Sequence, residues 1–274
     1  MAAAAPARGR RVRAIGWPLM LALLGGLGLL YAPMAALVVY SFNASERVLV
    51  WGGWSTVWYG RLLDNSAIHE ALGRSVLVGA ASASLATVFG AAAGYALARF
   101  GAFPGRGLFA ALGAAPLVVP EVALGLALLL LFVSLDQAIG WPAQRGLVTV
   151  ILSHASIASA YVAIVVQARL ARFDAALEEA AADLGCPPFQ GFLRVTLPLI
   201  APGLAAGWLI AFTLSFDDLV IASFTTGPGA GTLPMLAFSK VRLGLSPEIN
   251  ALATLLLLGV LSLGVLAFVL QRRR

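Results

Sequence analysis

The sequence predicts an all-α integral membrane protein with six transmembrane helices. Of its 274 residues, 61% are hydrophobic and only 11% are charged, and the mean hydropathy is +0.94. Soluble domains carry about 25% charged residues, so this chain has too few to cover a water-facing surface. The charges that are present separate long uncharged runs, and roughly 20 apolar residues cross a bilayer as a helix. This pattern excludes a soluble enzyme, a disulfide-rich secreted scaffold and a disordered chain.

Six runs that are almost free of charge are long enough to span the membrane. We expect helices at residues 15–41, 75–98, 107–133, 146–168, 199–222 and 248–270. The first run is longer than the roughly 7–15 residues of a signal-peptide core, so it is interpreted as an uncleaved helix. Together the helices are expected to form one domain, residues 15–270, between short termini at 1–14 and 271–274.

A seventh uncharged run, residues 219–239, has the length of a span but not its composition. It contains the residues Thr225, Thr226, Gly227, Pro228, Gly229 and Pro234. Such residues interrupt helices, and interrupted backbone exposed to lipid would leave polar groups without partners. We therefore expect a loop or a re-entrant segment between the fifth and sixth helices.

Basic residues are distributed unequally between the two ends of the expected helices. Twelve of the 18 lysines and arginines fall on the side of the two termini, and six fall on the opposite side. Because cytoplasmic loops are enriched in Lys and Arg, both termini are expected in the cytoplasm. The formal charge of +6 is thus explained by orientation in a lipid bilayer, and no nucleic-acid partner is expected.

The longest segment expected in the cytoplasm, residues 169–198, has the pattern of two short helices. Residues 174–184 are strong helix formers, and Gly185 can end this helix in a left-handed conformation. A second helix is expected after two prolines, with an apolar stripe along one face; the residues concerned are Pro187, Pro188, Phe189, Phe192 and Leu193. Exposed apolar side chains at helical spacing favour docking into a groove of another protein.

This segment resembles the signature loop of ABC-type importer permeases. The loop has Glu-Ala-Ala, three residues, Gly, nine residues and Ile-x-Leu-Pro, and only Val195 departs from it, in place of Ile. The resemblance implies a type I ABC importer permease fold, in which this loop is the coupling helix that enters a cleft of the ATPase subunit and transmits its closure. The residues expected to take part in coupling to the ATPase are Glu179, Ala180, Ala181, Gly185, Phe189, Phe192, Leu197 and Pro198.

The chain lacks the motifs of an ATPase. A Walker A loop needs Lys followed by Ser or Thr, and the single lysine, Lys240, is followed by Val241. With one cysteine, Cys186, and no constellation of ligands or nucleophiles, no metal site and no catalytic site are expected. The chain is therefore expected to be a transport subunit without a cofactor, while ATP and Mg²⁺ bind a separate ATPase.

Three carboxylates lie within or beside the expected spans. Glu121 falls about 21 Å into the third span from its cytoplasmic start, and Asp217 and Asp218 fall near the outer end of the fifth, about 24 Å in. Intramembrane carboxylates are costly and usually functional, so all three are candidates for meeting a cation in a translocation pathway. An ordinary position at a helix end is the alternative for each.

Two further polar sites favour structural roles. The run Ser246-Pro247-Glu248 is typical of a helix start, with a capping hydroxyl, a first-turn proline and an acidic residue near the positive end of the helix dipole. His154, inside the fourth span, is expected to form an interhelical hydrogen bond and not to bind a metal.

Further segments resemble permeases of polyamine importers, most of all the putrescine type, with spermidine permeases next. They are residues 116–121, 215–218, 224–229, 240–242 and 246–250. The resemblance implies a multi-pass subunit of a bacterial inner membrane that imports polyamine by alternating access. It also implies a heterodimer with a homologous permease, two ATP-binding subunits and a periplasmic polyamine-binding protein. Importers of another solute such as ferric iron, a stand-alone secondary transporter or channel, and a scaffold are the alternatives.

Overall fold

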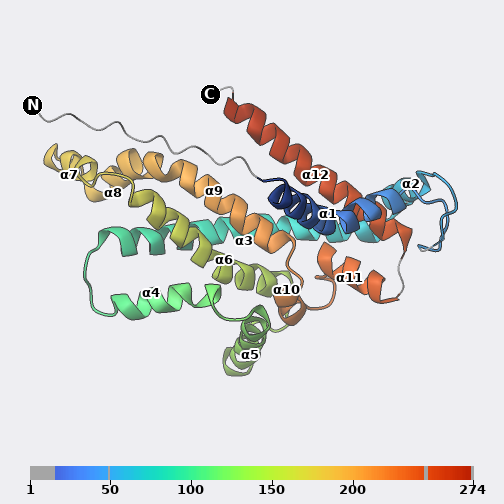
Figure 1. Ribbon diagram of the computed structural model, residues 1–274. Coiled ribbons are helices and arrows are strands. Elements are labelled where there is room, and N and C mark those ends of the chain that lie inside the picture. Colours follow the sequence, from blue (N-terminus) through green and yellow to red (C-terminus); the bar gives the residue numbers. More distant parts are fainter. Residues whose placement is uncertain (1–15, 49, 244–245, 273–274) are drawn as a thin grey trace, which may run out of the picture. The chain divides into compact units, whose positions relative to one another are not determined.

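The computed structural model describes residues 16–48, 50–243 and 246–272, and it is built from helices (Figure 1). Within these ranges the only other regular pairing is an isolated bridge between Asn43 and Trp54. The all-helical class is therefore confirmed. Of the expected terminal segments, 1–14 and 271–274, only residues 271–272 are described, and they continue the last helix.

Five helical segments of the described ranges are long and apolar enough to cross a membrane. They are Trp17–Tyr40, Ser66–Arg99, Glu121–Ile139, Leu147–Leu170 and Pro188–Phe216. The sixth expected helix is present as α12, Pro247–Arg272, but its side chains are described only as far as Ser262. Its described apolar part, Pro247–Ser262, is shorter than a full span.

The chain divides into two compact units, Met1–Asp64 with Gly244–Arg274, and Asn65–Leu243. In the first unit, α12 packs against both α1, Trp17–Tyr40, and α2, Val57–Asp64. The loop between α1 and α2 is organised by the buried Asn43. Its side-chain amide donates to the Val50 carbonyl at 2.8 Å, and its carbonyl oxygen accepts from the Gly52 N–H at 2.8 Å.

The second unit is built around three helices that pack closely: α3, Ser66–Arg99, α6, Leu147–Leu170, and α9, Leu197–Phe216. Their shared core consists of small and branched side chains, namely Ala83, Ala86, Ala158, Val162, Val166, Leu170, Ile200 and Ala211. Where α3 crosses α6, a Cβ atom on Gly90 would lie 2.6 Å from the carbonyl oxygen of Ser159. Small residues thus bring the helix backbones into contact, as is common in lipid.

The substitution Gly90→Ala is expected to destabilise the subunit by about 1–3 kcal/mol, because the added methyl group forces α3 away from α6. The thermal unfolding midpoint of the purified subunit in detergent measures this effect. Gly73→Ala is the matched control, since Gly73 is on the same helix and a Cβ there would meet nothing within 4 Å. Equal midpoints for the two variants would contradict the close packing at Gly90.

The second helix starts earlier than the uncharged run predicts. α3 begins at Ser66, and the side chain of the preceding N-cap residue, Asn65, accepts a hydrogen bond from the Ile68 N–H at 3.3 Å. Arg74 directly precedes the uncharged run that predicts this helix, and Glu70 lies one turn earlier. In the structure they form an ion pair of 3.3 Å, four residues apart on the same helix, so the charged turn extends the helix.

The expectation of one helix over residues 107–133 is wrong. The chain forms α4, Arg106–Ala114, a 3-10 turn η1, Ala115–Leu117, and then α5, Glu121–Ile139, which runs in a different direction from α4 (Figure 1). Pro116 and Pro120 lie at the break, and proline lacks the N–H that a helix interior needs. The break places Glu121 at the start of a helix instead of inside one.

The expected fifth helix, 199–222, is also interrupted. α9 ends at Phe216, and after a short break α10 covers Val220–Thr225. The segment expected as a loop or re-entrant stretch, residues 219–239, contains this short helix and the first part of α11, Leu233–Leu243. Gly227, Pro228 and Gly229 lie between the two helices. α10 packs against α5 and α6, and α11 packs against α3, so the interrupted backbone is covered by protein.

Candidate functional site

The two helix breaks meet at one small cavity of about 60 Å³ in the second unit. Its wall includes residues from the start of α5, the middle of α6 and the break between α9 and α10. The polar ones are Glu121, His154, Tyr161, Ser215 and Asp218. Folding therefore brings together two of the three carboxylates that the sequence singled out.

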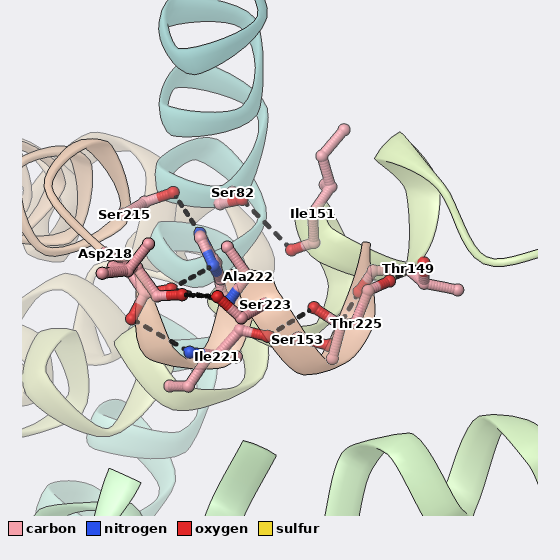
Figure 2. A network of polar contacts seen from close by, with 12 residues as sticks. Ser82, Thr149, Ile151, Ser153, Ser215, Asp218, Ile221, Ala222, Ser223 and Thr225 are labelled. Atoms are coloured by element: carbon pink, nitrogen blue, oxygen red, sulfur yellow. Dashed lines mark hydrogen bonds and ion pairs between the residues drawn. The ribbon is translucent and has the colours of Figure 1, made fainter. Parts of the chain in front are cut away.

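Asp218 lies just before α10, and its carboxylate bonds the first turn of that helix (Figure 2). Its Oδ2 accepts a hydrogen bond from the Ala222 N–H at 2.8 Å, and Oδ1 accepts one from the Ile221 N–H at 3.4 Å. The side chain is only 11% exposed. Asp218 thus satisfies backbone donors that the first turn of a helix would otherwise leave without partners.

His154 connects α6 to both sides of the break. Its Nε2 lies 3.1 Å from Oδ2 of Asp218, and its Nδ1 is hydrogen-bonded to the Ser215 hydroxyl at 2.6 Å. The imidazole is buried, so this contact is shielded from water. The expected interhelical hydrogen bond of His154 is confirmed, and its partners show that the residue fixes the broken segment.

The far end of α10 is anchored on α6 as well. The Thr149 hydroxyl donates to the Thr225 carbonyl at 2.6 Å, and both side chains are buried (Figure 2). The Arg145 guanidinium donates to the Phe224 carbonyl at 3.0 Å. Since both ends of α10 are held, the carboxylate of Asp218 is kept in place beside the cavity.

Glu121 differs from Asp218 in having a free carboxylate. It is exposed at the first position of α5, where an acidic side chain is favoured by the helix dipole. Within the described part of the chain its carboxylate makes no hydrogen bond or ion pair, yet it lines the cavity. Its oxygens are therefore available to a ligand that donates hydrogen bonds.

Asp217 is separated from its neighbour. It follows the last residue of α9, where its N–H donates to the Thr213 carbonyl at 3.2 Å. Its side chain is exposed and does not line the cavity. The cavity therefore carries the carboxylates of Glu121 and Asp218 beside a single imidazole, and this surplus of acidic groups favours a cation.

The segment expected in the cytoplasm, residues 169–198, forms the two short helices that the sequence predicts, α7, Ala176–Asp183, and α8, Pro188–Gly191. Gly185 has a φ of +80°, so the expected left-handed helix end is confirmed. Its N–H donates to the Ala182 carbonyl at 2.8 Å, and the Cys186 N–H donates to the Ala181 carbonyl at 3.0 Å. These bonds close the end of α7 and redirect the chain toward α8.

The two aromatic residues of the expected apolar stripe point in different directions. Phe189 is 71% exposed, as an anchor for a partner would be. Phe192 instead packs edge-to-face on Tyr95 of α3, with ring centroids 5.3 Å apart. The difference arises because Phe192 begins a π-helical turn, η2, Phe192–Thr196, that leads directly into α9. The expectation that Phe192 is exposed on a docking face is therefore wrong.

The other residues expected to couple the permease to the ATPase lie before and after the π-helical turn η2. Glu179 and Ala180 are exposed on α7, and Ala181 is half-buried. Leu197 packs against the core of α3, α6 and α9, while Pro198 is exposed in the first turn of α9. The exposed part of the segment and the part that joins the bundle are thus distinct.

Sequence reasoning missed a polar contact at the base of this segment. Oε2 of Glu178 lies 2.7 Å from Nε of Arg99 at the end of α3. Its Oε1 accepts a hydrogen bond from the Thr196 hydroxyl at 2.6 Å. The sequence does offer a signal, because Arg99 ends the second span and α7 is acidic. It does not identify the partner of Arg99, because α7 carries three acidic residues.

Comparisons with known proteins agree with this architecture. The family model described as "Binding-protein-dependent transport system inner membrane component" matches residues 86–273. The chain is 54% identical to the putrescine transport system permease protein PotI of Escherichia coli K12, over 94% of this chain and 91% of the relative. It is 38% identical to the spermidine/putrescine transport system permease protein PotC of the same strain, over 85% of each chain.

Two solved structures share the fold. One is a bacterial ABC transporter involved in the import of the acidic polysaccharide alginate, with a TM-score of 0.66 over 98% of this chain and 99% of that one. The other is a bacterial alginate ABC transporter in complex with an alginate pentasaccharide-bound periplasmic protein, with a TM-score of 0.68 over 92% of each chain. Both are 16% identical in sequence, so they support the expected fold and carry no information on the solute.

Proposed function

Because the chain belongs to the family of binding-protein-dependent transport system inner membrane components, we propose that it is the membrane-spanning permease subunit of an ATP-driven polyamine importer. Putrescine is the first expected solute, and spermidine is the second. The observation that carries the proposal is the cavity in which Glu121 and Asp218 face the same space. The identity to PotI and PotC supports the same solute class.

The cavity suits one end of a polyamine. A cavity needs roughly 10–15 Å³ of such space to hold one water molecule, so about 60 Å³ leaves room for the ammonium end of a polyamine. An ammonium group donates three hydrogen bonds, which the free oxygens of Glu121 can accept. Asp218 adds charge from a fixed position, and the exposed Asp217 beside it is proposed to attract the cation as it approaches.

The proposed assembly is the one that the family resemblance implies. The subunit pairs with a homologous permease and with two ATP-binding subunits, which supply ATP and Mg²⁺ binding, while a periplasmic polyamine-binding protein delivers the solute. Both termini face the cytoplasm, in line with the excess of basic residues on that side. ATP-driven closure of the ATPase pair moves the segment from Glu179 to Pro198, and the cavity changes the side to which it opens.

Uptake by the assembled complex in lipid vesicles tests the proposal. We expect uptake of labelled putrescine that requires ATP, the ATPase subunits and the binding protein. Spermidine and ferric iron are tested in parallel with their own loaded binding proteins. Uptake of iron alone would reject the polyamine assignment, and putrescine flux without the ATPase subunits would identify a channel or secondary transporter instead.

Glu121→Gln is expected to lower the catalytic efficiency of putrescine uptake about tenfold, mainly through a higher KM, because an amide binds an ammonium group more weakly than a carboxylate does. Initial uptake rates over a range of loaded binding protein measure both parameters. Glu70→Gln is the control, since Glu70 is exposed and pairs with Arg74 on α3 away from the cavity. An unchanged efficiency in Glu121→Gln would remove Glu121 from the pathway.

A further inference from the structure

We infer that Glu178 is the positioning residue through which movement of the cytoplasmic segment reaches the membrane helices. The inference rests on the proposed function, because it concerns how ATP-driven closure is used by the permease. Glu178 directly precedes the signature residue Glu179, and the pattern of the signature loop does not include it. Its assignment comes from the contacts of its carboxylate alone.

The carboxylate of Glu178 is shared between two membrane helices. Oε2 contacts Arg99, the last residue of α3, at 2.7 Å. Oε1 accepts the hydrogen bond of Thr196, at 2.6 Å, in the π-helical turn that continues into α9. A displacement of α7 therefore acts on α3 and α9 at the same time, through one rigid planar group.

Partial burial strengthens this connection. The side chains of Arg99 and Glu178 are 17% and 23% exposed, and Thr196 is buried. A close ion pair at such a site is screened less by water than exposed ion pairs, which contribute little. By contrast, the ion pair of Arg61 with Glu46 has side chains 54% and 78% exposed and a longer contact of 3.4 Å.

A second contact supports the same end of α3. Tyr95, one turn before Arg99, packs edge-to-face on Phe192 of the π-helical turn. α3 then runs along α6 and α9 through the common core, and close-packed interiors transmit small displacements. α6 carries His154 and Tyr161, which line the cavity. A continuous packed route thus connects Glu178 to the proposed cation site.

Adjacent carboxylates on α7 therefore have different surroundings. Glu179 is exposed on the surface of α7 and available to a partner, whereas Glu178 is directed to the bundle by Arg99 and Thr196. Loss of the Glu178 contacts should leave binding of the ATPase subunits intact and weaken the transmission of their movement. This separation distinguishes a positioning role from a docking role.

Glu178→Gln in the complete complex tests the inference, with putrescine uptake and ATP hydrolysis measured in the same vesicles. We expect the amount of putrescine imported per ATP hydrolysed to fall about tenfold, because a neutral amide retains the shape of the carboxylate but loses the charge that pairs with Arg99. The amount of ATPase subunit that copurifies should match that of the wild type. Glu70→Gln, the same change in an Arg–Glu pair at the opposite end of α3, should leave the ratio unchanged.

Arg99→Gln, alone and combined with Glu178→Gln, provides a second test of the inference. If Arg99 and Glu178 act as a unit, the double variant should lower the ratio no further than either single variant does. Additive losses, an unchanged ratio in Glu178→Gln, or reduced copurification of the ATPase would each overturn the inference. Absence of uptake by the wild-type complex would instead reject the proposed function, so the two failures are distinguishable.

Discussion

Gly185→Pro is expected to abolish ATP-dependent uptake while the subunit still inserts into the membrane. Gly185 has a φ of +80°, and proline is restricted to a φ near −65°. Proline would also remove the N–H that Gly185 donates to Ala182. Because these features end α7 and redirect the chain toward α8, the substitution should displace the whole exposed surface offered to the ATPase.

Uptake and ATP hydrolysis in reconstituted vesicles measure this effect, and the amount of subunit in the membrane fraction shows insertion. Gly185→Asn is the matched variant, because asparagine tolerates the left-handed conformation better than other residues with a side chain and keeps the N–H. It should retain most of the uptake. Normal coupling between ATP hydrolysis and uptake in Gly185→Pro would count against a coupling role for this segment.

Asp218→Ala should have the second largest effect, because one side chain both starts α10 and faces the cavity. Its removal leaves the N–H groups of Ile221 and Ala222 without their acceptor and takes away the partner of His154. Loss of such a helix cap alone costs about 1–2 kcal/mol of stability. We expect a lower thermal unfolding midpoint together with uptake reduced at least tenfold, as the proposed site loses a carboxylate.

Asp218→Asn separates the two contributions. Asparagine can still cap α10, so stability should largely recover, while uptake should stay low because the charge is absent. Asp217→Ala should have a smaller effect, since Asp217 is exposed and lies outside the cavity wall. If Asp218→Asn restores full uptake, the charge of Asp218 has no role in cation passage and the residue serves only to hold α10.

Features set by neighbouring residues could be predicted directly. The uncharged runs located the long helices because a span depends on composition over about 20 consecutive residues. Gly185 was identified as a helix end because glycine after a strong helix former is the usual left-handed terminator. The run from Ser246 to Glu248 is likewise correctly predicted as the start of α12, where the Ser246 hydroxyl accepts from the Glu248 N–H at 3.3 Å.

Errors arose where charge was used as a boundary or where breaks were hidden in an apolar run. The pair of Glu70 and Arg74 lies inside α3 because the two charges neutralise each other on one face. The break before Glu121 was missed because the run around Pro116 and Pro120 is uncharged. Hydropathy depends only on composition. The backbone path at these positions depends instead on proline, which lacks the N–H that a continuous helix needs.

The sequence by itself determined that this chain is a helical membrane protein with two short helices between its fourth and fifth expected spans, since both properties depend on local composition and spacing. Only the tertiary structure decided how the scarce charges are used. It placed Glu121 and Asp218 at one cavity and left Asp217 outside it. It also joined Glu178 to Arg99 across two helices. These pairings depend on helix packing, which brings together residues far apart in the chain and therefore leaves no periodic signal in the sequence.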